Sequence, residues 1–505
     1  MFDKRLIGLG DIMASERKFL AFDLGAESGR AVMGLLDGGR LRLADVHRFA
    51  NGGVSIGDSL YWDVLRLFDE MKRGLRLAVE AHGKDIAGIG VDTWGVDFAL
   101  LGPNDVLLEN PHCYRDSRID GMMAEAEKIV PRSEIYEQTG IQFMPINTLY
   151  HMLAITRSNR WMLEAARTML MMADLFNFFF TGERACEFTN ATTTQFYNPR
   201  AGDWARSLLE WLDIPSHFLP EIVQPGTVLG KVRASIADET GAGQVSVIAP
   251  ATHDTGSAVA AVPAVGHGHV YISSGTWSLM GVESKEPIIN DQALELNFTN
   301  EGGVENTFRV LRNIMGLWLV QECRKTWAQS GRDYSYSQLT EMAEAAEPFR
   351  AIVNPDDPVF LKPGDMPARI REFCKQTNQP APDDEGSVAR TALDSLALKY
   401  RWVLERLEML MGSRLEPVHI VGGGIQNRLL CQLTADVTGR QVVAGPVEAT
   451  AIGNVLVQAI ALGQIGSLEE GRGIVRRSFD VVTYDPRPDS RIEGAYGRLE
   501  ALTGG

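Results

Sequence analysis

The sequence predicts an α/β protein of two lobes with a cleft between them, on three observations. Short apolar runs of strand type alternate with amphipathic helical segments. A strand, a glycine turn and a second strand occur near Gly25, and the same arrangement recurs near Gly275. No long linker or low-complexity tract appears. We place the lobes at residues 18–260 and 261–485, between an N-terminal extension (1–17), expected to be flexible, and a C-terminal tail (486–505).

The first lobe is predicted from its order of strands and helices. An apolar run from Phe19 ends in Asp-Leu-Gly, and a second strand from Arg30 ends in a Gly-Gly turn. Apolar residues at helical spacing predict a helix from Leu60 to Ala81. The run Ile86–Val91 is typical of a buried strand and leads into Asp92-Thr-Trp-Gly-Val-Asp97.

The same pattern restarts near Gly243. A strand at 244–249 leads to a short alanine-rich helix at 255–262, and then to a second hairpin at 270–281. We place the boundary between the lobes near residues 258–266. A long helix is predicted from Val388 to Met411, with Ser387 as its candidate N-cap. The strand Val418–Val421 enters three glycines, and two further helices are expected to start near residues 429 and 449.

Charge and cysteine content exclude several classes of protein. The formal net charge is -16, and the sequence has no stretch rich in Lys or Arg, which argues against a nucleic-acid partner. Five scattered cysteines without a C-x-x-C pair indicate free thiols in a reducing cytoplasm. No apolar run is long enough to cross a bilayer, so we expect no membrane partner.

Two loops contain residues suited to phosphate and proton chemistry. The turn Asp23-Leu-Gly-Ala-Glu-Ser-Gly-Arg30 can present backbone amides to a phosphate chain, and Asp23 could hold Mg²⁺ through water. A hairpin without a ligand is the alternative. In Ala251-Thr-His-Asp254, the aspartate precedes a small-residue helix, where it is either a general base or merely a helix cap. Asp97 is the second candidate for the base.

Two further turns and two missing motifs complete the pattern. Ser274-Gly-Thr276 offers amides and hydroxyls opposite the first turn, and Gly422-Gly-Gly424 allows a close approach of the backbone to a ligand. The pairs Gly83-Lys84 and Gly230-Lys231 lack the hydroxyl residue of a P-loop. The run from Gly241 lacks the third glycine of a dinucleotide fingerprint, which argues against a Rossmann dehydrogenase.

These four loops, at residues 23–30, 251–254, 274–276 and 422–424, occur in an order that resembles the FGGY family of carbohydrate kinases. That family is a branch of the actin/hexokinase superfamily. The resemblance covers residues of about 18 to 485. It implies two actin/hexokinase-like (ribonuclease H-like) lobes with a catalytic cleft between them. More specific strings resemble those of the members that act on L-rhamnulose; they are Asp92–Phe98, Tyr114–Arg118, Thr189–Gln195, Ser274–Gly281, Asn300–Gly303 and Asn313–Trp318.

The resemblance also implies the roles of individual residues. The family's proton acceptor falls on Asp254. Its nucleotide contacts fall on Ala26, Glu27, Ser28, Gly29, Arg30, Thr276, Gln321 and Gly423. Its sugar contacts fall on Gly95, His253, Asp254, Thr255 and Asn313. Other members often have a small hydroxyl residue where this chain has Glu27, so backbone amides are the expected donors there. Trp94, next to Gly95, either packs in the core or contacts the deoxysugar methyl.

The implied reaction is ATP-dependent phosphorylation of L-rhamnulose at its 1-hydroxyl, with Mg²⁺ as cofactor and ATP as co-substrate. A kinase for L-fuculose or another ketose is the nearest alternative. An inactive sugar sensor is disfavoured because both Asp23 and Asp254 are present, and an actin-like switch because the loops at Asp92 and His253 are of the sugar type. We expect a cytoplasmic monomer or small homo-oligomer.

Overall fold

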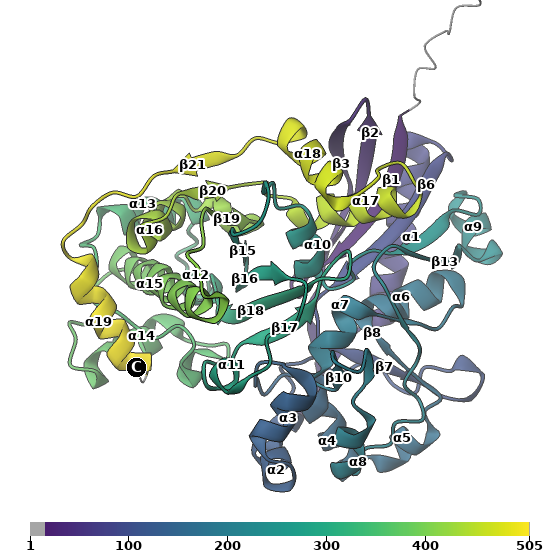
Figure 1. Ribbon diagram of the computed structural model, residues 1–505, viewed down its shortest axis with the longest axis horizontal. Helices are drawn as coiled ribbons and strands as arrows, with labels where there is room; N and C mark the ends of the chain where they lie inside the picture. Colours follow the sequence, from purple (N-terminus) through teal and green to yellow (C-terminus); the bar gives the residue numbers. More distant parts are fainter. Residues whose placement is uncertain (1–15, 504–505) are drawn as a thin grey trace, which may run out of the picture.

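The first lobe is built on a six-stranded mixed sheet in the computed structural model, which describes residues 16–503 (Figure 1). Strand β1 lies in the middle, antiparallel to β2 and parallel to β6. The strand order is β13 (Thr227–Lys231), β14 (Ser246–Ala249), β6 (Ile86–Thr93), β1 (Arg17–Leu24), β2 (Ser28–Asp37) and β3 (Arg40–Ala50). Residues 1–15 of the predicted extension lie outside the described residues, and Arg17 already belongs to β1.

The first lobe also contains four two-stranded ladders and ten α-helices among the described residues. The two-stranded ladders are β4 (Gly53–Ile56) with β5 (Ser59–Trp62), β7 (Phe98–Leu101) with β8 (Thr168–Met171), β9 (Cys186–Glu187) with β12 (Ile222–Val223), and β10 (Tyr197–Asn198) with β11 (Asp203–Trp204). The helices are α1 (Val64–His82), α2 (Met122–Ile129), α3 (Arg132–Thr139), α4 (Thr148–Ser158), α5 (Arg160–Ala165), α6 (Met172–Thr181), α7 (Phe188–Ala191), α8 (Arg206–Trp211), α9 (Ala234–Thr240) and α10 (Asp254–Ala260).

The helix predicted from Leu60 starts later than expected. Residues 59–62 form strand β5 instead, and the helix begins at Val64, with Asp63 as its N-cap. The Asp63 carboxylate accepts a hydrogen bond from the Arg66 backbone N–H, which satisfies one of the free donors of the first turn.

The second lobe repeats the arrangement of the central strands. Its sheet has the order β17 (Thr299–Gly302), β18 (Phe308–Met315), β16 (Trp277–Ser284), β15 (Val270–Ser274), β19 (Val418–Val421), β20 (Val442–Ala444) and β21 (Val482–Tyr484). Strand β15 is antiparallel to β16 and parallel to β19, as β1 is to β2 and β6. The helices are α11 (Asp291–Glu295), α12 (Trp318–Gln329), α13 (Tyr336–Ala345), α14 (Met366–Gln376), α15 (Glu385–Met411), α16 (Arg428–Thr438), α17 (Ala449–Ala461), α18 (Leu468–Ser478) and α19 (Ile492–Thr503).

The N-cap predicted for the long helix α15 is wrong. The helix starts at Glu385, and Asp384 is its N-cap. Ser387 is the third helical residue and closes a capping box, because its hydroxyl accepts from the Asp384 N–H while the Asp384 carboxylate accepts from the Ser387 N–H. Gly386 lies in this first turn, and its low helix propensity hid the true start.

Helix α17 ties the two lobes together. It follows β20 in the second lobe, yet its side chains Asn454 and Gln458 bond to Asp92 and to the Leu20 carbonyl in the first sheet. Its Gly453 lies against α10, since a Cβ built there would be 1.8 Å from the Ser257 carbonyl oxygen. Figure 1 shows α17 and α18 lying beside the first strands of the chain. The crossing of α10 and α17 therefore forms the centre of the contact between the lobes.

The cysteines predict insensitivity to reductant. All five are buried and free, and burial raises the pKa of the Cys113 and Cys431 thiols to about 12, which suppresses the reactive thiolate. Thermal melts with and without dithiothreitol are therefore expected to coincide. A melting temperature that falls on reduction would contradict the assignment. No helix between residues 16 and 503 is long and apolar enough to cross a membrane.

Candidate active site

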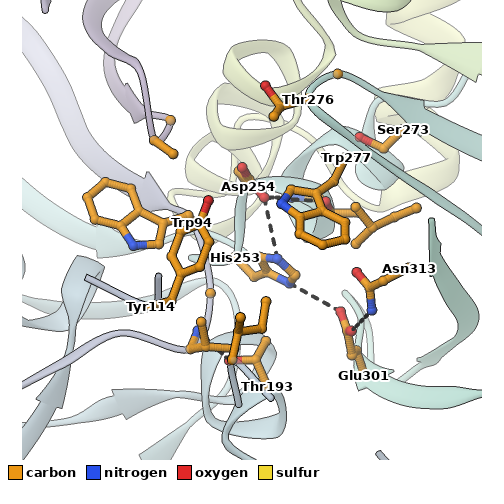
Figure 2. Close-up of a pocket in the computed structure, with 18 of the residues that line it drawn as sticks. Trp94, Tyr114, Thr193, His253, Asp254, Ser273, Thr276, Trp277, Glu301 and Asn313 are labelled. Carbon is orange, nitrogen blue, oxygen red and sulfur yellow. Dashed lines mark hydrogen bonds and ion pairs between the residues drawn. The ribbon is translucent and has the colours of Figure 1, made fainter. Parts of the chain in front are cut away.

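A pocket of about 410 Å³ lies between the lobes, where the two glycine hairpins face each other (Figure 2). This volume lies within the range of small-molecule sites. Each hairpin is closed by a glycine N–H: Gly25 donates to the Ser28 carbonyl, and Gly275 donates to the Trp277 carbonyl. A bridge between Thr93 and His253 connects the end of β6 to the start of α10.

The structure brings most of the predicted site residues to this one pocket. Its lining includes Asp23, Ala26, Ser28, Gly95, His253, Asp254, Thr255, Thr276, Asn313 and Gly423. Four others do not line it. They are Glu27, Gly29, Arg30 and Gln321.

Two of these four are held back from the pocket for different reasons. Arg30 donates to Asp23 at 2.6 Å and also to Glu448, so its guanidinium is already neutralised by two carboxylates. Gln321 lies on α12, and its side-chain oxygen is buried without a hydrogen bond. Arg30 would have to change partners, and Gln321 would have to become accessible, to reach a nucleotide in the pocket.

The position of Asp254 differs from that of a helix N-cap, which is the alternative to a general base. His253 is the N-cap of α10, and Asp254 is the first helical residue. Its carboxylate accepts a hydrogen bond from the N–H of the next residue, Thr255, at 2.6 Å, whereas a cap accepts from a residue two or three positions on. About 33% of its side chain is exposed, and this part faces the pocket. Burial raises its pKa above the ordinary value, and the Asp23 charge adds to this against the attraction of His253. A carboxylate with a raised pKa is a stronger base.

The string Thr189–Gln195 supports both sides of the pocket floor. The Thr189 hydroxyl accepts a hydrogen bond from the His253 N–H at 3.1 Å. The Thr193 hydroxyl accepts one from the Val96 N–H at 3.0 Å, next to Gly95. These buried threonines set the backbone of the two loops for which sugar contacts are expected.

Asp97 is an anchor for aromatic side chains. One of its carboxylate oxygens accepts from the indole N–H groups of Trp62 at 2.6 Å and Trp94 at 2.8 Å, and from the Tyr114 backbone N–H at 3.2 Å. The residue is 2% exposed. Asp97 is therefore unavailable as a base. The Trp94 ring is oriented by this bond and lines the pocket beside Tyr114 (Figure 2). It therefore packs against Trp62 in the core and also contributes to the pocket wall.

Two carboxylates lie at the ends of neighbouring strands below the hairpin. Asp23 on β1 and Asp92 on β6 are paired in register. Asp92 is fully buried, and it accepts a hydrogen bond from Asn454. Burial, followed by the Asp23 charge, raises its pKa well above the ordinary value. Sequence analysis gave Asp92 no role of its own, although it named the string in which it lies.

Asp23 fits the indirect magnesium contact expected of it. It lines the pocket, and one of its oxygens is held by the two Arg30 bonds. Among residues 16–503 no cluster of three or more His, Cys, Asp or Glu side chains could hold a metal by itself. A single carboxylate acting through water, with nucleotide phosphates as the main ligands, agrees with the preference of Mg²⁺.

Comparison with protein families decides the assignment of the chain. Two domain models match it almost end to end: the N-terminal domain of the FGGY family of carbohydrate kinases at residues 19–261 and the C-terminal domain at 270–462. The chain belongs to this family. It is therefore a carbohydrate kinase with the two-lobed fold expected from its sequence.

Individual relatives agree with the family. A protein named Rhamnulokinase from Bacteroides thetaiotaomicron is 43% identical over 481 residues, which cover 95% of this chain and 98% of that protein. One of the same name from Bacillus subtilis is 40% identical and covers 94% and 96%. The solved structure of ligand-bound xylulose kinase from Lactobacillus acidophilus superposes with a TM-score of 0.77, covering 97% and 96% at 17% identity, which supports the fold.

Proposed function

We propose that this chain transfers the γ-phosphoryl group of ATP to the 1-hydroxyl of L-rhamnulose, giving ADP and L-rhamnulose 1-phosphate. The assignment of the substrate rests on the sequence identity of 40–43% to relatives named Rhamnulokinase, over more than nine tenths of this chain. The proposed base Asp254 and residues of both glycine turns line one pocket, which supports the proposed reaction.

In this reaction Asp254 accepts the proton of the 1-hydroxyl while that oxygen attacks the γ-phosphorus. The bond from phosphorus to the bridging oxygen breaks, and its electron pair leaves with ADP. Backbone amides of the turns at 25–29 and 275–276, apart from those of Gly25 and Gly275 that close the hairpins, stabilise the negative charge of the transferred group. Phosphoryl transfer depends mainly on positioning and charge. Magnesium, held through water near Asp23, would supply further positive charge at the phosphates.

The nucleotide is placed on the second-lobe side of the cleft, at Thr276, Gly423 and Gln321, with its phosphates reaching the turn Ala26–Arg30. Glu27 and Gly29 contribute their amides. The sugar is placed on the other side, at Gly95, His253, Thr255 and Asn313. Thr276, Gly423 and these four sugar-side residues line the common pocket, which supports the arrangement.

The net charge and the free thiols support a proposal for the cellular location and the partners. We assign the chain to the cytoplasm, as a monomer or small homo-oligomer whose partners are sugar and ATP. Neither nucleic acid nor membrane is expected as a partner. The net charge of -16 and five free buried cysteines support this.

A coupled ADP-release assay across ketoses tests the function. With Mg²⁺ present, kcat/KM is expected to be highest for L-rhamnulose, ahead of L-fuculose and D-xylulose, and EDTA should abolish turnover. A higher kcat/KM for L-fuculose would mean that the chain is a sugar kinase whose preferred substrate is L-fuculose. Calorimetry with a non-hydrolysable ATP analogue is the control. If a folded sample does not bind the analogue, the proposal of ATP-dependent phosphoryl transfer is contradicted.

A further inference from the structure

We propose that Glu301 is a specificity-determining residue whose Oε1 accepts a hydrogen bond from a secondary hydroxyl of the sugar. The inference rests on the proposed function, since it takes the ligand to be a ketose. It adds a contact to the predicted set, in which the string Asn300–Gly303 appears only as part of a resemblance.

Two neighbouring strands place Glu301 at the pocket. It lies on β17 and pairs in register with Arg309 on β18. Arg309 and Asn313 are four residues apart on β18, so their side chains share one face of the sheet. Glu301 and Asn313 both line the pocket, and Figure 2 shows their side chains facing each other.

One oxygen of Glu301 lies at ion-pair distance from two side chains behind the pocket and makes no hydrogen bond there with the described residues. Its Oε2 lies 3.2 Å from the Arg309 guanidinium and 3.3 Å from Nδ1 of His253. Arg309 is fully buried and also donates to the Gly302 carbonyl at 2.7 Å. Burial would raise the pKa of Glu301, but His253 and Arg309 together bring it below the ordinary value. Glu301 is therefore an ionised carboxylate next to a buried cation.

The other oxygen retains acceptor capacity. The Asn313 backbone N–H donates to Oε1 of Gln142 at 2.8 Å, which fixes the orientation of that amide. The Asn313 side-chain NH₂ then donates to the same Gln142 oxygen at 3.1 Å and to Oε1 of Glu301 at 3.5 Å. The second contact is at the limit of a hydrogen bond. A carboxylate has about four acceptor positions, so Oε1 can take a further donor.

This part of the wall therefore offers acceptors, namely Glu301 Oε1 and the Asn313 amide oxygen. Such a surface fits hydroxyl donors and repels a carboxylated sugar. His253 spans the distance to the base, because its Nε2 lies 3.4 Å from Asp254 while Nδ1 faces Glu301. A ketose with its 1-hydroxyl at Asp254 can extend its secondary hydroxyls toward Glu301.

The test compares Glu301→Gln with wild type on L-rhamnulose and on dihydroxyacetone, which has no secondary hydroxyl. We expect kcat/KM for L-rhamnulose to fall about 10- to 100-fold, mostly through KM, as for the loss of one hydrogen bond to a charged group. The value for dihydroxyacetone should change little. An equal loss on both sugars would overturn the proposal, because Glu301 would then act through His253 and Asp254.

Two further variants guard against a fault in folding. Glu301→Asp keeps the charge beside Arg309 but withdraws it from the sugar, so it should show the same selective loss with a melting temperature near wild type. Glu283→Gln is the matched control, since Glu283 is a partly buried glutamate, 15% exposed, that is paired with Arg472 at 2.6 Å and does not line the pocket. It should leave the ratio between the two sugars unchanged. If wild type phosphorylates neither sugar, the proposed function fails before Glu301 is tested.

Discussion

Asp254→Asn is expected to lower kcat by about 10²–10⁴-fold, the usual cost of losing a general base. Asparagine keeps the shape of the side chain and can still accept from the Thr255 N–H, so α10 should start in the same way. It cannot take the proton of the sugar hydroxyl at neutral pH. Thermal stability and sugar KM should therefore change much less than turnover. Steady-state kinetics and a thermal melt of the same sample measure both effects.

The control for this variant is Asp291→Asn. Asp291 is also the first residue of a short helix, α11, but it is exposed and does not line the pocket. It should retain wild-type turnover. If Asp254→Asn also kept kcat near wild type, Asp254 would be only a helix-start residue. Asp92, the buried carboxylate at the end of β6, would then be the next group to test, since Asp97 is taken up by its three donors.

Asp97→Ala is expected to cost about 3–5 kcal/mol of unfolding free energy, because buried groups left without a partner are expensive. The change would strand the indole N–H groups of Trp62 and Trp94 and the Tyr114 amide. The sugar-side wall should loosen, and KM for the ketose should rise. Urea denaturation monitored by tryptophan fluorescence measures the stability. A stability loss below about 1 kcal/mol would show that the indoles find water or other partners.

Asp97 also predicts how stability depends on pH. Burial raises its pKa to about 7, against the hydrogen bonds from Trp94 and Trp62. The pKa of Asp97 is higher in the folded protein than in the unfolded chain. Its contribution to the free energy of unfolding is therefore complete below the unfolded pKa and is lost as the pH rises through about 7. Asp97→Asn should therefore show a smaller decline in unfolding free energy between pH 5 and 8 than wild type, by the same urea assay. Parallel declines would contradict the assignment.

Local patterns predicted the elements that depend on local chemistry. The strand Val418–Val421 and the start of α17 at Ala449 agree with the structure, as do the hairpins around Gly25 and Gly275. Apolar runs and glycine turns act over a few residues, so their signal is complete within a short window. The start of α15 was misplaced because Asp384 and Ser387 cap each other across Gly386.

For the site, sequence determined the residue types and the two-lobed kinase fold, and with the resemblance it indicated Asp254 and both hairpins. Only the tertiary structure decided which side chains are free to act. Arg30 is held by Asp23 and Glu448, Asp97 by two tryptophans, and Glu301 faces the pocket. The role of a charged side chain depends on its partners and burial. Here those partners come from strands and helices as far apart as Asp92 and Asn454, and no local pattern reports such contacts.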